Sequence, residues 1–254
     1  MFDKAYWNER AEKYGHTGHG EPFYYCFDQQ ARLYAIEGLI RQLSISKEMA
    51  LDFGCGSGDF TALLTRHFNT VYAYDISEMM IRKVRTRFPQ ASVMVSDKLE
   101  EVMADRRFDL LLSVTVLQTF NVYELDQALS VLAAHLSEKG VFVAMEFFTS
   151  QEFNRQLNET KATDEEWRKL LTKYGLKITS VRGFINPHLA PSKSWDSYNN
   201  NLFLKSLKPF KHFAFAQAQF IRSARKILNH YKDASPETGG PLHFYTIQKE
   251  QTCN

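Results

Sequence analysis

The sequence predicts an α/β fold, in which a mostly parallel sheet of seven strands carries helices on both faces. Between residues 49 and 184, short apolar segments alternate with segments of helical periodicity, as in right-handed βαβ units. The segment FDLLLSVTV at residues 108–116 is almost entirely apolar, as expected of a strand buried on both faces. The chain has 254 residues, 44% of them hydrophobic, which is enough for one such core with added segments.

Two helices are expected at the start of the chain, at residues 2–14 and 28–43. The second carries Leu33, Ile36, Leu39 and Ile40 at helical spacing, and Asp28 is its expected N-cap. The sequence HTGHGEPFYY between them, rich in Gly and Pro, predicts a loop. Residues 1–46 are therefore expected to form an N-terminal helical cap.

The core is expected at residues 47–184. Its predicted strands are residues 49–53, 71–75, 92–96, 108–116, 141–148 and 176–184. Its predicted helices are residues 60–68, 77–88, 122–136 and 164–174, with Ser77 as a cap. The last strand, residues 243–248, belongs to a final segment at 241–254.

An insert at residues 185–240 separates the last two strands, where a hairpin would need only a few residues. A long helix is expected at residues 213–231, with Phe220, Ala224, Ile227, Leu228 and Tyr231 on one face. We predict one domain over residues 1–254, in which the N-terminal cap and the insert cover the substrate.

The sequence LDFGCGSGDFT at residues 51–61 is the most informative signal. An apolar strand ends at Asp52, three glycines follow in alternation, and a helix begins. Glycine allows a sharp turn and close approach to a ligand, and the helix start presents free N–H groups. An acidic residue at the end of the next strand, Asp75, can accept both hydroxyls of a ribose. The spacing differs from the G-x-G-x-x-G of nicotinamide dehydrogenases, which disfavours that class.

These segments resemble the class I S-adenosylmethionine-dependent methyltransferases. LDFGCGSGDFT is similar to their first motif, VYAYDISEMMIRKVR to the ribose-binding region, and SDKLEEV to the adenine-contacting region. FDLLLSVTVLQTF and GVFVAMEFF resemble their fourth and fifth strands. The resemblance covers about residues 47–148 and implies a Rossmann-like fold with S-adenosylmethionine as the cofactor.

The resemblance also implies roles for individual residues. Gly54, Gly56 and Gly58 should approach the methionine part of the cofactor, with Cys55 as a small filler of the loop. The expected partners of the other cofactor groups are Asp52 near the ammonium, Asp75 on the ribose, Ile76 and Asp97 with Lys98 at the adenine, and Val114 near the amino-acid end.

The loop after the fourth strand bears on the methyl acceptor. Enzymes that methylate base amino groups resemble one another in an Asn/Asp-Pro-Pro-aromatic motif there, whereas this chain has VTVLQTF. Nucleic acid is therefore disfavoured, and a polar or acidic small molecule is the expected acceptor. Tyr24, Tyr25, Gln118 and Trp195 are the expected substrate contacts.

The sequence identifies no catalytic base. The candidates are Tyr25 and the histidines at positions 16, 19, 188 and 212, of which His19 and His188 are preferred. Transfer from a sulfonium depends mainly on alignment and exclusion of water, so a base is not obligatory.

Charge leaves three interpretations of the insert open. Residues 185–233 carry eight Lys or Arg against two Asp, although the whole chain has a net charge of only +2. The basic residues of the insert would form a solvated helix face, a lid for an acidic substrate, or an RNA-facing surface.

The remaining predictions concern location and rival functions. Three cysteines without a framework or metal spacing, and no apolar leader or span, predict a cytoplasmic monomer or homodimer with no metal and no membrane partner. An RNA or protein methyltransferase, or a non-catalytic S-adenosylmethionine-binding protein, remains the alternative.

Overall fold

The computed structural model describes residues 4–16, 21–90, 92–148, 161–184, 187–189, 192–232 and 242–250. The contacts divide the chain into two compact units. The core unit comprises residues 1–17, 44–181 and 242–254, and the helical unit comprises residues 18–43 and 182–241. Each unit is therefore assembled from segments that are distant in sequence.

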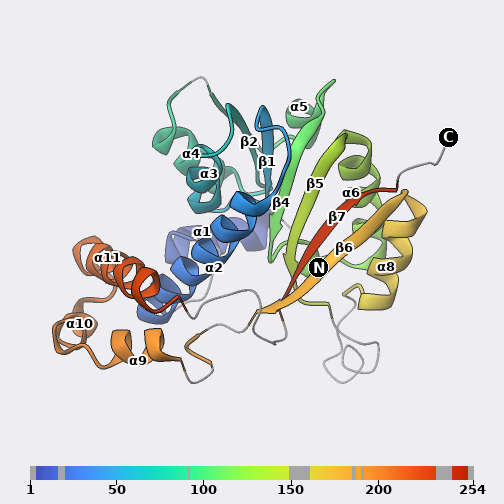
Figure 1. Ribbon diagram of the computed structural model, residues 1–254. Helices are drawn as coiled ribbons and strands as arrows, with labels where there is room; N and C mark the ends of the chain where they lie inside the picture. Colours follow the sequence, from blue (N-terminus) through green and yellow to red (C-terminus); the bar gives the residue numbers. More distant parts are fainter. Residues whose placement is uncertain are drawn as a thin grey trace. The chain divides into compact units, whose positions relative to one another are not determined.

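Seven strands form one sheet in the order β3-β2-β1-β4-β5-β7-β6 (Figure 1). They are β1 (Met49–Phe53), β2 (Thr70–Tyr74), β3 (Val93–Ser96), β4 (Phe108–Val114), β5 (Leu136–Glu146), β6 (Leu176–Phe184) and β7 (Leu242–Lys249). The neighbours from β3 to β5 pair in parallel, and β7 pairs antiparallel with β5. The predicted Rossmann-like sheet is confirmed.

Both faces of the sheet are covered by helices, because the strand residues alternate between them. On β2, Tyr72 packs into a cluster with α5 (Leu99–Met103), α6 (Val122–His135) and α8 (Asp164–Lys173). Its neighbour Ala73 packs with Ile81 and Val84 of α4 (Glu78–Arg87) on the other face. The short helix α3 (Asp59–Leu64) follows the glycine loop. The predicted helices on both faces are thereby confirmed.

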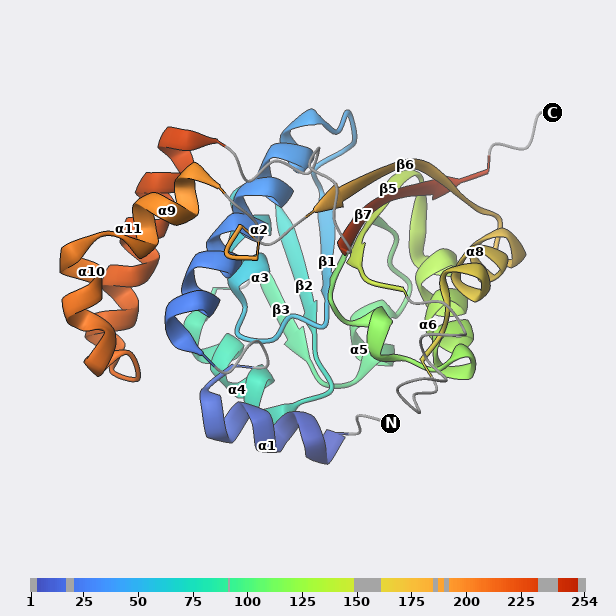
Figure 2. The same cartoon turned by 90° about the horizontal axis from the view of Figure 1, so that it is seen from below.

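The first helix, α1 (Lys4–Tyr14), lies beside α4 within the core unit (Figure 2). The Ser77 hydroxyl donates to Asn8 Oδ1 at 2.7 Å, and Lys83 Nζ donates to the carbonyl of Gly15. Ser77 is also the N-cap of α4, as predicted, since its side chain accepts from the Met80 amide. The helix α1 is thus anchored next to the strand ends that carry the glycine loop and Asp75.

The helical unit packs α2 (Pro22–Gln42) against α11 (Ala214–Tyr231), with α9 (Lys193–Asn199) on α11. Ala216, Phe220, Ala224 and Leu228 are buried at helical spacing on α11, which confirms most of the apolar face predicted for it. Phe23 of α2 lies edge-on to Phe220 at a centroid distance of 5.1 Å. The short α10 (Leu202–Leu207) and the 3₁₀ turn η2 (Lys208–Phe210) connect α9 to α11.

One predicted helix start is wrong. The helix α2 begins at Pro22, six residues earlier than expected, so Asp28 is not a cap but a buried residue in its interior. Glu21 is the N-cap and accepts from the Tyr24 amide at 3.0 Å. Proline is favoured at the first helical position, where the backbone nitrogen has no helical hydrogen bond to make. Pro22 is therefore a helix start, although the sequence HTGHGEPFYY that contains it predicts a loop.

Other boundaries differ by less. The helix α3 ends at Leu64 rather than at residue 68. The strand β5 begins at Leu136 rather than at residue 141, because residues 136–140 are already extended. The sequence did not predict α5, α9 and α10, which have between five and seven residues and are too short to show a clear helical period.

Candidate active site

The glycine loop joins β1 to α3 and owes its shape to left-handed backbone. Gly54 has φ +79° and Gly58 has φ +78°, conformations that residues with a Cβ rarely adopt. A Cβ on Gly54 would lie 2.3 Å from Cγ2 of Val116. The amides of Gly54 and Cys55 both donate to the Tyr74 carbonyl at 2.8 Å, which ties the loop to the end of β2. The three glycines are therefore required by the backbone, as the sequence predicts.

Asp75 follows β2 and faces this loop. Its Oδ2 accepts from the Gly56 amide at 2.8 Å and its Oδ1 from the Ser77 amide at 2.9 Å. The residue is 7% exposed, and this burial raises the pKa of its carboxyl above the ordinary value. The hydrogen bonds from the Gly56 and Ser77 amides act in the opposite direction and lower the pKa by less. Each carboxylate oxygen has a second lone pair, so Asp75 retains the capacity to accept two further hydrogen bonds.

Asp52 is the second buried acid of the loop. It lies on β1, is 2% exposed and accepts from the Thr61 hydroxyl of α3 at 2.6 Å. Burial, with repulsion from Asp75 as a smaller cause, raises the pKa of Asp52 to about 7. A cation near this carboxylate would lower that pKa, because it would stabilise the charged form. The buried thiol of Cys55, whose pKa is raised by the same burial, is suited to filling space rather than to attack.

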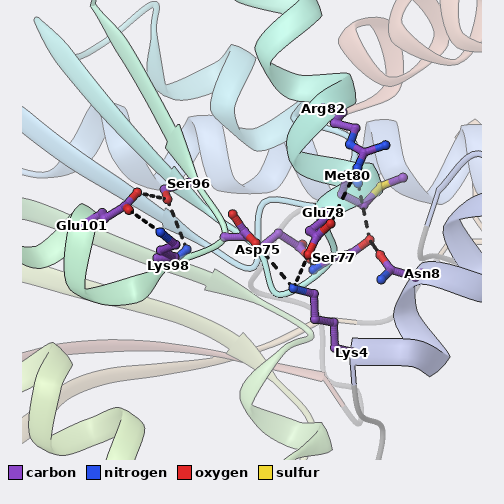
Figure 3. A network of polar contacts seen from close by, with 11 residues as sticks. Lys4, Asn8, Asp75, Ser77, Glu78, Met80, Arg82, Ser96, Lys98 and Glu101 are labelled. Carbon is purple, nitrogen blue, oxygen red and sulfur yellow. Dashed lines mark hydrogen bonds and ion pairs between the residues drawn. The ribbon is translucent and has the colours of Figure 1, made fainter.

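Residues at the ends of β2 and β3 form part of a polar network that includes α1 (Figure 3). Lys4 Nζ contacts Glu78 Oε1 at 2.5 Å and Asp97 Oδ2 at 3.5 Å. Lys98 is exposed and pairs with Glu101 at 3.0 Å. Ile76 is 39% exposed next to Asp75, so an apolar surface is open to a planar ligand. Asp97, Lys98 and Ile76 therefore lie at the ends of β2 and β3, as predicted, and Asp97 has a lysine partner that the sequence did not reveal.

A buried acid that the sequence analysis missed, Glu146, lies at the end of β5. It is fully buried and accepts from the Ser113 hydroxyl at 2.7 Å and from the amides of Val116 and Gln118 at 3.3 and 3.2 Å. Burial raises the pKa of its carboxyl to about 7. The available signal was a carboxylate within the apolar strand GVFVAMEFF, which is costly unless it is hydrogen-bonded.

Glu146 organises the segment after β4, where Val114 and Gln118 were predicted to contact ligands. Val114 is the half-buried last residue of β4. Thr115 has φ +56°, a strained value for a residue with a branched side chain. The Gln118 side chain accepts from the Phe147 amide at 2.9 Å, so its oxygen is engaged in holding two strand ends together. A contact of Gln118 with substrate stays a prediction.

Three of the predicted substrate and catalytic residues meet in the helical unit. The rings of Tyr24 and His188 stack at 5.3 Å with an interplanar angle of 6°, and Trp195 lies 5.5 Å from Tyr24 and 5.8 Å from His188. His188 Nδ1 forms an ion pair with the buried carboxylate of Asp28. We call these four residues the aromatic–histidine cluster.

Of the remaining candidates, the structure describes Tyr25, His16 and His212. Tyr25 is half-buried on α2, and His212 is exposed. His16 stacks on Tyr14 in the core unit at 6.3 Å. His19 lies outside the described residues. The role of each in catalysis stays a prediction.

Comparison with known families agrees with this geometry. Residues 50–140 match the family described as "Methyltransferase domain". The match runs from β1 through the glycine loop, Asp75 and Asp97 to β5, and the strand order 3-2-1-4-5-7-6 belongs to the same class. The matched segment is a methyltransferase domain with the class I strand order. S-adenosylmethionine is the methyl donor of this family, in agreement with the sequence analysis.

Two curated relatives each resemble less than half of this chain. "Trans-aconitate 2-methyltransferase" of Variovorax paradoxus is 32% identical over 119 residues, 46% of this chain and 45% of that protein. "Malonyl-[acyl-carrier protein] O-methyltransferase" of Priestia megaterium is 34% identical over 90 residues, 33% of each protein. The chain thus spans less than half the length of these relatives.

A solved structure extends the likeness in fold. The cyclopropane synthase MmaA2 from Mycobacterium tuberculosis is 15% identical, with a TM-score of 0.55 over 84% of this chain and 82% of that chain. Within the described residues, no group of three or more His, Cys, Asp or Glu is arranged to hold a metal ion. No helix in those ranges is long and apolar enough to cross a bilayer.

Proposed function

We propose that the protein transfers the methyl group of S-adenosylmethionine to a small molecule bearing a carboxylate. The observation that carries the cofactor assignment is Asp75, a buried carboxylate beside three left-handed glycines that still has two free acceptor positions. The acceptor is inferred from the two curated relatives, because aconitate and the malonyl group are both carboxylic acids.

The residues present fit the cofactor. Asp75 would hold the ribose hydroxyls, Gly54, Gly56 and Gly58 would admit the methionine part, and Asp52 would face its ammonium. Ile76 would pack on the adenine, Asp97 with Lys98 would accept from its amino group, and Val114 would adjoin the amino-acid end. The bound cofactor supplies a methyl group on a positively charged sulfur, which is a good leaving group.

A carboxylate acceptor suits a site without an assigned base. A carboxylate at neutral pH is already ionised, so one of its oxygens could accept the methyl group without loss of a proton. The S–CH3 bond of the cofactor would break, and the neutral thioether would leave. The protein then contributes alignment of the two reactants and exclusion of water. The lysines and arginines of residues 185–233 would favour the approach of an anion.

The test is a panel of acceptors incubated with S-adenosylmethionine carrying a labelled methyl group, with products identified by mass spectrometry. We expect methyl esters of small di- or tricarboxylates and no label in RNA or protein. Label only in RNA or protein would overturn the acceptor, whereas absence of S-adenosylmethionine binding by calorimetry would overturn the cofactor assignment itself.

The aromatic–histidine cluster supports a second candidate, an acceptor hydroxyl or amine whose proton His188 removes. The Asp28 carboxylate at Nδ1 would orient the ring, which is the arrangement of a general base. His188→Gln then lowers kcat about 100-fold. A kcat within about twofold of wild type with a carboxylate acceptor would leave the first candidate standing alone.

A further inference from the structure

The surface around α10, η2 and the start of α11 is unusually apolar for a solvent-facing one. Five large side chains within fourteen residues are about half or more exposed: Leu202 (82%), Phe203 (57%), Phe210 (48%), Phe213 (58%) and Phe215 (56%). Among the described phenylalanines these four are the only exposed ones. Single exposed apolar residues are common, but a contiguous exposed cluster of them is typical of an interaction site.

These side chains are not a displaced core. The same segment already buries Leu204, Ala216 and Phe220, each fully, so the helices have a packed face of their own. Phe210, Phe213 and Phe215 instead contact one another, with ring centroids 6.0–6.3 Å apart. The rings thus form one continuous apolar spot that faces solvent.

Basic residues predominate in the segment that carries this spot. Between Asp196 and Asp233 the chain contains no Asp or Glu. The same stretch carries seven basic residues, Lys205, Lys208, Lys211, Arg222, Arg225, Lys226 and Lys232. Lys205 is exposed, whereas Lys211 is paired with Glu21 at 2.8 Å. Exposed Phe and Leu among lysines is the composition of segments that lie in the interface of an anionic bilayer.

We propose that this aromatic–basic surface, residues 202–215, docks the protein on an anionic lipid bilayer. The phenylalanines and Leu202 would enter the headgroup region while the lysines meet the lipid phosphates and carboxylates. Such docking needs no membrane-spanning helix, so the absence of a span from the sequence does not bear on it.

Two other occupants fit less well. In a two-fold dimer the same surface would face its own copy, and residues 202–215, which contain three lysines and no Asp or Glu, would oppose one another. Bound RNA stacks its bases on aromatic faces and is held by arginine, but the most exposed side chain here is Leu202 and residues 202–215 contain no Arg.

The test is co-sedimentation of the full chain with phosphatidylcholine vesicles, alone and with about 30% phosphatidylserine. We expect binding to the anionic vesicles, weakened by salt, and at least about tenfold weaker binding to the neutral ones. Phe213→Ser combined with Phe215→Ser should reduce the partition coefficient about 100-fold, and Lys205→Glu several-fold.

Matched controls alter equally exposed residues elsewhere. Tyr123→Ser removes a ring that is 67% exposed on α6, and Lys177→Glu reverses an exposed charge on β6. Both should sediment like wild type, and cofactor affinity should be unchanged in every variant, which verifies folding. Equal sedimentation of wild type and the double Phe variant would overturn the proposal. So would binding of an RNA oligonucleotide without vesicle binding, or dimerisation that the double Phe variant abolishes.

Discussion

The candidate sites of the two units are built in different ways. The site in the core unit depends on backbone geometry, because left-handed glycines, strand ends and helix starts place Asp52 and Asp75 around a loop of five residues. The site in the helical unit depends on side-chain contacts, since its aromatic–histidine cluster joins residues 24 and 28 to residues 188 and 195. A backbone site leaves a short, ordered signature in the sequence, whereas a side-chain site assembled from residues as far apart as 24 and 195 leaves almost none.

The largest expected effect compares a glycine from each unit. Gly54→Ala should reduce cofactor affinity more than about 100-fold and lower the free energy of unfolding by 1–3 kcal/mol or more, because of its positive φ and the clash with Val116. Gly38→Ala lies in the helix α2 with nothing within 4 Å of the new Cβ, and should raise the free energy of unfolding by about 0.5–1 kcal/mol. Calorimetry and urea unfolding measure both. Similar effects of the two changes on stability and on cofactor affinity would contradict the requirement for glycine at position 54.

The next comparison uses two buried carboxylates, one in each unit. Asp75→Ala removes the proposed ribose acceptor and should weaken S-adenosylmethionine binding by about 1.5–3 kcal/mol, which is roughly 10- to 100-fold. Asp28→Asn should leave cofactor affinity within about twofold of wild type, because its partner is His188. Titration calorimetry on both folded variants decides the matter. Unchanged affinity in Asp75→Ala would remove this residue from the site.

The smallest expected effect is a pH dependence. The pKa of Asp52 is about 7 without a ligand, and the ammonium of the cofactor would lower it. Binding then releases a proton, so affinity should rise up to about tenfold from pH 6 to pH 8. Asp52→Asn should flatten this dependence. Calorimetry in two buffers of different ionisation enthalpy counts the released protons, and a count of zero at pH 6.5 would contradict the role of Asp52.

Burial of Asp52 also makes the free energy of unfolding depend on pH, and this quantity should fall with rising pH whereas cofactor affinity should rise. Its folded-state pKa is raised above the ordinary value of 3.8, so the folded protein binds more protons than the unfolded chain between about pH 4 and 7. The contribution of Asp52 to the free energy of unfolding is therefore greatest at low pH and is lost as the pH rises through about 7. High pH should thus favour cofactor binding while weakening the free protein.

The sequence predicted the core better than the helical unit for physical reasons. The strand residues 49–53 and 176–184 were placed without error, because strand periodicity and glycine punctuation are local. Asp28 was assigned to a helix start, since nothing nearby in sequence shows that its partner is His188. Glu146 was passed over because its three donors lie between positions 113 and 118 and meet it only when β4 and β5 pair.

The position of β7 has a consequence for folding during synthesis. This strand, residues 242–249, occupies an inner place in the sheet between β5 and β6. A ribosome that has made residues 1–241 has therefore produced two strands whose shared neighbour does not yet exist, and their apolar edges stay open. Open strand edges are sites of aggregation, so the nascent chain passes through its most vulnerable state shortly before residue 249 emerges.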